Sequence, residues 1–503
     1  MPGFLFAQEN NFLTGRICLP CPESLSLYRQ MRIEGECKMK FSLLMKRIAR
    51  GGSANPLNVL YDEAHLDKPL RRGLNWVMGG NMFGTLHGII CGGGTAAMVG
   101  LAGALGAGDM EFGLLVALPQ IAALMQLPFS MLVNKTQKRK IWLLTIGLFS
   151  RLLWMLFGFL PLLGGMEANT MKLYTLISLL GISSICGSVI NVCWFPWFSD
   201  MCPLRIRGRW LSFRDSILAV GSLLFGLLVA YMLDILPIDS KYIVIFLIGG
   251  ALGVMDMVCF GFAPEVKPAS SKKIQMGKTM LEALRNKPFR QLTIMWTVWN
   301  FTANLSGAYL TPYAMNSMGL NFMQITVFGT VAASVATVII VPRWGRALDQ
   351  YGARNVMLLG CIGASLTPLF YLISTPGDVL PTLLHNLVGA FFWCGSNLAA
   401  NGMQLSASPD ESRPTYIAIF SCITALVGTA LGTMCGGWLL EWWNGLGWFV
   451  GFFDRYKVLI LLSVVLRFGF TMLLVPRMEK TAADNGTLRD VAHMLLPAKR
   501  VRY

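Results

Sequence analysis

Charged residues are scarce in this sequence. Asp, Glu, Lys and Arg make up 14% of its 503 residues, whereas 54% are hydrophobic. A soluble protein of average composition has about a quarter of its residues charged. The composition therefore argues against a set of soluble domains and for a protein that lies in lipid.

The sequence also lacks the pattern of a disulfide framework or a metal site. Its 12 cysteines are scattered, and most stand inside apolar runs, as small apolar side chains do. Cys18 and Cys21 form one Cys-x-x-Cys pair without a close His, whereas a zinc site needs about four ligands. We therefore expect no metal and no cofactor.

Residues 1–73 contain no long apolar run. The stretch at 4–6 is too short for the apolar core of a signal peptide. We expect a largely disordered cytoplasmic tail. Translation could also start at Met39, in which case residues 1–38 would not be made.

From residue 74 onward, the chain is a series of apolar stretches. A helix needs about 20 residues to cross the hydrocarbon core of a bilayer. Backbone groups in lipid must be bonded within the segment, so stretches of this length are best explained as helices. The sequence predicts an all-α integral membrane protein with twelve transmembrane helices, in two bundles of six. We place them near 74–102, 111–133, 140–162, 171–199, 212–237, 241–263, 291–316, 322–342, 355–374, 379–404, 414–440 and 456–476.

The positive charges indicate the orientation of these helices. If the first helix runs outward from the cytoplasm, most of the 42 Lys and Arg residues fall on the cytoplasmic side. The opposite face has Lys172, Lys241, Arg455 and Lys457. The positive-inside rule then places both termini in the cytoplasm and the protein in the cytoplasmic membrane. Topology thus explains the net charge of +16, and no nucleic-acid partner is needed.

The connection at 264–290 is the longest between two predicted helices. Its Gly277-Lys278-Thr279 is similar to the end of a phosphate-binding loop, but Lys272 stands at the position of the leading glycine and no strand precedes it. We interpret 276–290 as a basic amphipathic helix on the membrane face. The chain thus divides into a tail at 1–73, a bundle at 74–263, the central loop at 264–290, a bundle at 291–476 and a cytoplasmic tail at 477–503.

The two bundles repeat each other at a constant offset of 206 residues. The connection after the fourth helix, with Arg207, Gly208 and Arg209, corresponds to the one after the tenth helix, with Arg413. Such duplication is typical of transporters whose halves are related by an axis along the membrane normal. The matching pairs are Asn191 and Asn397, Pro203 and Pro409, Arg207 and Arg413, Trp210 and Tyr416, Ala219 and Ala425, and Gly226 and Gly432.

A short charged loop lies between the eighth and ninth predicted helices. It contains Gly345, Asp349, Gly352 and Arg354, and Gln350 follows the Asp. This resembles the signature loop of the major facilitator superfamily, Gly-x-x-x-Asp-Arg-x-Gly-x-Arg, with Gln in place of the basic residue. The corresponding loop of the first half has Asn134 at the Asp position and no carboxylate.

The resemblance implies alternating access, in which two six-helix halves rock about a central site. It also implies that Asp349 helps to close a cytoplasmic gate by facing the N-terminal end of helix eleven, with Arg413 or Arg354 as partner. A carboxylate at a helix N-terminus is favoured by about 0.3–1 kcal/mol, enough to bias a two-state equilibrium a few-fold. The alternative is that the loop only anchors the topology.

Replacing Asp349 by Ala should remove this bias. If the loop is a gate, accessibility should shift toward the inward-open state, as measured by cysteine labelling from both sides of the membrane. Unchanged labelling would support the anchor instead.

Three ionisable residues inside the predicted helices are candidates for a role in transport. Arg151 could bind an anionic solute, whereas Asp256 and His87 could carry protons, because charged groups at membrane depth are costly. The alternatives are that Arg151 and Asp256 form a purely structural pair and that His87 bonds a backbone carbonyl.

Polar and aromatic residues also suggest contacts with a solute. Asn300 and Asn304 share one face of the seventh predicted helix, among Trp and Tyr residues, and such a face suits a polar or sugar-like molecule. Gln120, Asn191 and Trp194 could contribute from the first half. The alternative is that these amides hold helices together.

We interpret the chain as a secondary transporter of a small organic solute, surrounded by membrane lipid and coupled to protons or another ion. We expect a monomer and no enzymatic activity, because no His-Glu-x-x-His or comparable cluster is present. The solute could be a sugar-like metabolite or an amphiphilic, drug-like molecule. A non-transporting sensor on the same scaffold is the alternative, and an ordered ligand-binding domain in 1–73 would favour it.

Overall fold

The computed structural model describes residues 56–136, 138–162, 170–265, 276–409, 413–446, 454–479 and 487–495. In these ranges the secondary structure is helical. The chain divides into two units after His65. The described part of the first unit is helix α2 (Pro56–Glu63) with two following residues, and all further statements concern the second unit.

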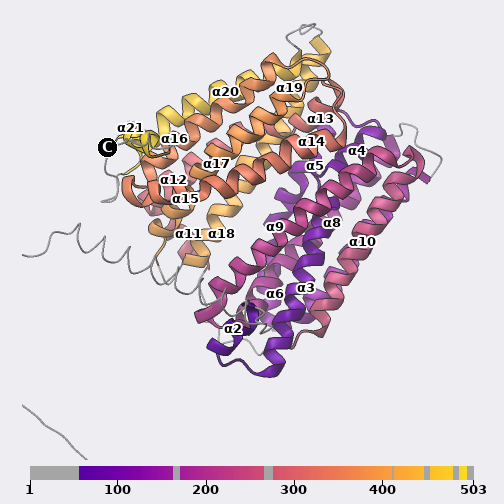
Figure 1. Ribbon diagram of the computed structural model, residues 1–503, viewed down its shortest axis with the longest axis vertical. Coiled ribbons are helices and arrows are strands. Elements are labelled where there is room, and N and C mark those ends of the chain that lie inside the picture. The colour runs from indigo at the N-terminus through magenta and orange to yellow at the C-terminus, as the bar shows by residue number, and fades with distance from the viewer. Residues whose placement is uncertain are drawn as a thin grey trace, which may run out of the picture. The chain divides into compact units, whose positions relative to one another are not determined.

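The first half of the second unit is drawn in indigo to magenta in Figure 1. Its elements are α3 (Lys68–Ile90), α4 (Ala96–Ala104), α5 (Asp109–Ala122), η1 (Ala123–Met125), α6 (Gln126–Thr136), α7 (Arg139–Phe157), η2 (Leu160–Leu162), α8 (Thr170–Met201), α9 (Leu204–Ile235) and α10 (Ile238–Phe262).

The second half is drawn in orange to yellow. Its elements are α11 (Met276–Arg285), α12 (Lys287–Gly307), α13 (Leu310–Asn316), α14 (Phe322–Ile325), the π-helical η3 (Thr326–Val331), α15 (Ala332–Tyr351), α16 (Ala353–Leu366), η4 (Thr367–Ile373), α17 (Leu380–Ala407), α18 (Arg413–Ile423), the π-helical η5 (Thr424–Ala430), α19 (Leu431–Leu446), α20 (Arg455–Leu474), η6 (Val475–Arg477) and α21 (Leu488–Leu495).

These helices confirm the predicted all-α membrane fold. Among the described residues, eight helical stretches are long and apolar enough to cross a membrane. The other four predicted segments also fall on helices, but two are broken (α3–α4 and α12–α13), one has a shorter apolar part (Phe322–Thr337), and one is the polar-rich α17. All twelve predicted segments therefore coincide with helical structure.

The backbone between α3 and α4 packs closely on a neighbouring helix. A Cβ atom at Gly93 would overlap the carbonyl oxygen of Leu115, so the backbone here lies directly against α5. Thr95 then starts α4 by accepting a hydrogen bond from the amide of Met98. A helix continuing through this point would need side chains where α5 already lies.

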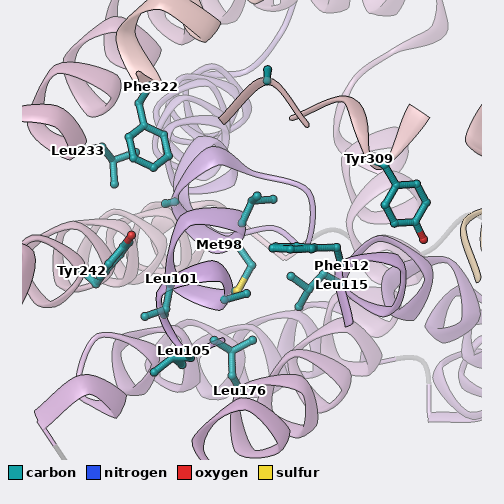
Figure 2. Packing of buried hydrophobic residues seen from close by; sticks show 14 of the residues in the cluster. Met98, Leu101, Leu105, Phe112, Leu115, Leu176, Leu233, Tyr242, Tyr309 and Phe322 are labelled. Carbon is teal, nitrogen blue, oxygen red and sulfur yellow. The ribbon is translucent and has the colours of Figure 1, made fainter. Parts of the chain in front are cut away.

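One hydrophobic cluster joins the two halves. Its buried residues come from α4, α5 and α9 of the first half and from α13, α14 and α20 of the second. Figure 2 shows Leu233 of α9 near Phe322 of α14. This cluster lies at the end of the molecule where α4 leads into α5, α9 into α10 and α13 into α14. We call it the outer end, because the distribution of charges predicts that it faces away from the cytoplasm. The opposite end is the inner end.

A second cluster lies within the second half. It contains Trp344, Val356 and Met357, and it includes Val491 and Leu495 of α21. Helix α21 was not among the predicted elements, because it is only eight residues long and lies in a polar segment. The central loop contains α11, and the chain turns at Asn286 before α12 begins. Residues 266–275 and the predicted N-terminal tail up to residue 55 lie outside the described residues.

Close packing of α16 on α17 predicts a stability effect. A Cβ atom at Gly360 would lie 2.8 Å from the Ser396 amide nitrogen and 3.0 Å from the Phe392 carbonyl oxygen. Gly360→Ala should therefore lower the free energy of unfolding by about 1–3 kcal/mol, measured as a lower melting temperature in detergent. Gly261→Ala is the control, because a Cβ atom there has no neighbour within 4 Å. Equal melting temperatures for the two variants would contradict the packing described here.

Candidate functional site

Asp109 connects the two halves at the outer end. It is the first residue of α5, and its carboxylate lies 3.1 Å from Nη2 of Arg455 and accepts a 2.5 Å hydrogen bond from the Tyr456 hydroxyl. Both partners lie at the start of α20. Asp109 is 6% exposed, so this ion pair is largely shielded from water.

Two further carboxylates bind backbone amides across the halves. Asp234 of α9 accepts hydrogen bonds from the amides of Phe322 (3.0 Å) and Met323 (2.8 Å), at the start of α14. Glu441 of α19 accepts one from the amide of Met110, at 3.2 Å. Amides in the first turn of a helix have no partner inside the helix and favour negative charge. The outer ends of α9 and α14, and of α19 and α5, are thus held together.

Glycines allow α5 and α19 to approach closely. A Cβ atom at Gly113 would overlap the hydroxyl of Tyr309, and one at Gly437 would lie 2.9 Å from the carbonyl oxygen of Asp109. The Tyr309 hydroxyl donates to the carbonyl oxygen of Thr433. Any side chain at either glycine would push the two halves apart.

The inner end is arranged differently. The extensive contacts of α6, α15 and α18 lie within their own halves. Asp349 is exposed on α15, and Arg354 donates to the carbonyl oxygens of Val475 and Pro476. The predicted partner side chain of Arg413 lies outside the described residues. The gate role of Asp349 stays a prediction.

The other residues of the two predicted loops lie as follows. Gly345 lies within α15, and Gly352 has a φ of 81°, a left-handed conformation that favours glycine and separates α15 from α16. Arg207 donates to the carbonyl oxygens of Ser199 and Cys202 at the end of α8. Gly208 and Arg209 lie in the first turns of α9.

Three cavities meet at Thr311 of α13. The largest, of about 650 Å³, lies between α9 of the first half and η3 and α15 of the second. The other two have volumes of about 200 and 140 Å³. Asn304 lines the second cavity, and His385 and Asn386 line the third.

Of the amide side chains predicted to contact a solute, only Asn304 lines one of these three cavities. Asn304 donates to the carbonyl oxygen of Asn300, and Asn300 donates to that of Trp296, each at 2.8 Å, so both amides use a donor within α12. Gln120 is partly buried on α5 and Asn191 is exposed on α8. Neither lines one of these three cavities.

Trp194 is likewise absent from the lining of the three cavities. Its ring stacks on Phe198, with the ring centroids 5.4 Å apart. The guanidinium of Arg214 lies 5.3 Å from the centroid of the same ring, a cation–π distance.

The predicted ionisable residues meet inside the first half. Nη2 of Arg151 lies 3.1 Å from Oδ2 of Asp256, and Nδ1 of His87 lies 2.8 Å from the carbonyl oxygen of Gly249. Both structural alternatives considered for these residues are thus observed as contacts. A role in transport is left untested by these contacts.

This cluster of His87, Arg151 and Asp256 is incompletely bonded. His87 Nε2, Arg151 Nε and Asp256 Oδ1 are buried and have no hydrogen-bond partner. Gly84 and Gly253 make room for it, because a Cβ atom would lie 2.8 Å from Asp256 Oδ2 at Gly84 and 2.5 Å from Arg151 Cδ at Gly253. None of its three members lines one of the three cavities.

Sequence reasoning missed the carboxylates at the outer end and the hydroxyl side chains of the largest cavity. Asp109 and Asp234 stand at helix ends, where a carboxylate is common, so nothing marked them as links between the halves. The spacing of Thr326, Thr330 and Ser334, every fourth residue on one helix, was a usable signal. Among the described residues, no group of three or more His, Cys, Asp or Glu is placed to hold a metal ion.

The buried ion pair predicts a non-additive effect on stability. Asp256→Leu leaves Arg151 unpaired and should lower the free energy of unfolding by about 3–5 kcal/mol. The double variant Arg151→Met, Asp256→Leu should recover most of that loss. Thermal unfolding of both single variants and the double variant measures the coupling, and additive losses would show that the pair is not coupled.

Comparisons with known proteins agree with the fold. The family model of the Major Facilitator Superfamily matches residues 81–396. Among curated proteins, no sequence gives a significant match.

Several solved transporters have a similar structure. The nucleoside transporter NupG is 13% identical, with a TM-score of 0.60 over 80% of this chain and 100% of that one. An auto-inhibited peptide transporter of the POT family is 11% identical, with a TM-score of 0.61 over 83% and 99%. A bacterial homologue of the human lysosomal transporter Spinster is 14% identical, with a TM-score of 0.56 over 83% and 100%.

At these identities the structural likeness shows only the fold. The family match covers more than half of the chain and therefore shows the family. The helices, the cavities between the halves and the family match lead to one conclusion. This chain is a multi-pass membrane protein that belongs to the major facilitator superfamily of transporters.

Proposed function

We propose that this chain is a secondary transporter that moves a small organic solute by alternating access, and that this structure is the state closed at the outer end. The observation that carries the proposal is the difference between the two ends. At the outer end one buried cluster and three carboxylates join the halves. At the inner end α6, α15 and α18 pack within their own halves.

The orientation follows from the charges. The outer end carries Lys172, Lys241, Arg455 and Lys457, whereas most of the 42 Lys and Arg residues fall on the other side. The positive-inside rule makes the inner end cytoplasmic. The cavities between the halves would then open to the cytoplasm of the cell, with both termini on that side.

The cluster of His87, Arg151 and Asp256 is the candidate for ion coupling. It lies inside one half, and each of its three side chains has a buried polar atom without a partner. Protonation of Asp256 would remove the charge that holds Arg151, and Arg151 could then change partners. Buried ionisable groups within a membrane are expected to have such roles.

Packing at the outer end provides a test that needs no known solute. Gly437→Val places side-chain atoms where the backbone of Asp109 and Met110 lies, and should disfavour the closed outer end by about 1–3 kcal/mol. The ratio of closed to open states should fall by roughly 5- to 150-fold. Hydrogen–deuterium exchange should therefore become faster at the start of α5, the start of α14 and the end of α19.

The matched control is Gly469→Val on α20, where a Cβ atom has no neighbour within 4 Å. This control should exchange like the wild type. The opening should also protect amides at the inner ends of α6, α15 and α18, because alternating access closes one end as the other opens. Faster exchange at both ends of the Gly437→Val protein would indicate general unfolding and contradict the proposal.

A further inference from the structure

The largest cavity identifies a class of ligand that the fold alone does not. Its volume of about 650 Å³ is in the usual range for small-molecule sites, roughly 300–1,000 Å³. Both halves contribute its walls: α3, α4 and α9 from one, and α13, α14, η3 and α15 from the other. A molecule bound there would contact both moving parts.

No lining residue of this cavity is ionisable. Val220 and Val335 line it with more than half of their surface exposed, so its mouth is apolar as well. A charged ligand would lose hydration here and gain no ion pair from the walls, at a cost of several kcal/mol. The polar lining consists of six hydroxyl side chains: Thr95, Ser222, Thr311, Thr326, Thr330 and Ser334.

Three of these six hydroxyls already donate a hydrogen bond within the protein. Ser334 donates to the carbonyl oxygen of Thr330 (2.8 Å), Ser222 to that of Leu218 (2.7 Å), and Thr95 to that of Ile90 (2.7 Å). A hydroxyl has one donor and two acceptor lone pairs, so these three groups can still accept a hydrogen bond, although Thr95 already accepts one from the amide of Met98. They suit a ligand that donates a hydrogen bond.

The part of the cavity lining that comes from α9 includes three small residues among larger apolar ones. Ala219, Gly226 and Ala230 lie on the cavity face of α9, and a Cβ atom at Gly226 has no neighbour within 4 Å. This wall leaves room for a bulky apolar group. Thr311 also lines the two smaller cavities, one of which contains Asn304 and the other His385. Nδ1 of His385 is buried without a hydrogen-bond partner.

We infer that this cavity binds a neutral amphiphile: a molecule with a bulky apolar body against α9 and a hydrogen-bond donor group near Thr311 and the hydroxyls of η3 and α15. This inference rests on the proposed function and names the class of its solute. It favours the amphiphilic molecule over the sugar-like metabolite, which would need more polar partners than six hydroxyls, three of which already use their donor.

Two dyes that differ by one charged group test the inference. N-phenyl-naphthylamine is neutral and has an apolar body with one N–H donor, and anilinonaphthalene sulfonate is the same skeleton with an added sulfonate. With the full chain in nanodiscs, the neutral dye should bind saturably above the signal of empty nanodiscs. The sulfonate should bind at least about tenfold more weakly.

A matched pair of variants locates the binding. Gly226→Leu fills the open space at the α9 wall, and leucine is favoured over glycine in a helix, so the variant should fold. It should weaken binding of the neutral dye at least about tenfold. Gly469→Leu makes the same change in open space on α20, and should bind the dye like the wild type.

Equal affinity for the two dyes, unchanged binding by Gly226→Leu, or equal loss in both glycine variants would each overturn the inference. The exchange experiment on Gly437→Val uses no ligand. If the dye experiment fails while the exchange experiment succeeds, the ligand class falls and alternating access stands. If only the exchange experiment fails, alternating access falls and the ligand class stands.

Discussion

The crossing of α5 and α19 at the outer end is the contact on which the rest of the arrangement depends. It is close because Gly113 and Gly437 have no side chains, and a Cβ atom at either would meet backbone of the other helix. The approach brings the start of α5 to α20, so that Asp109 reaches Arg455 and Tyr456. It also brings Glu441 to the amide of Met110. The close approach of α5 and α19 thus allows both the apolar packing and the polar contacts of Asp109 and Glu441 between the halves.

The buried ion pair and the largest cavity lie in different parts of this protein. The pair of Arg151 and Asp256 lies inside the first half, and neither residue lines one of the three cavities. Arg467 is similarly buried in the second half, where it donates to the carbonyl oxygen of Ala303 (2.8 Å) near the end of α12. The largest cavity lies between the halves and has hydroxyls as its polar groups. Ion-sensitive groups within a half and a neutral site between halves would let a proton and a solute act on the same equilibrium without direct contact.

The fold was predictable because its signals are local. Apolar length places the helices, and the repeat of 206 residues relates Trp210 on α9 to Tyr416 on α18, both of which are buried next to aromatic rings. A pair of Arg151 and Asp256 was considered as the alternative to roles in transport, because two opposite charges at membrane depth have few other partners. The outer contacts of Asp109 and Asp234 could not be foreseen, since both depend on which helix ends meet across more than eighty residues of sequence. The amide face of α12 was expected to bind solute, but Asn300 and Asn304 each use a donor on their own helix.

A pair of distance measurements tests alternating access most directly. Spin labels on noncanonical residues at Met171 and Ile373, which are 80% and 68% exposed near the outer end, would report that end. Labels at Lys138 and Gln350, both exposed, would report the inner end. The protein is measured as wild type in nanodiscs while pH or lipid composition is changed. The account predicts that the fraction of molecules with a longer outer distance and the fraction with a shorter inner distance increase together. An inner distance that varies while the outer distance stays constant would contradict it.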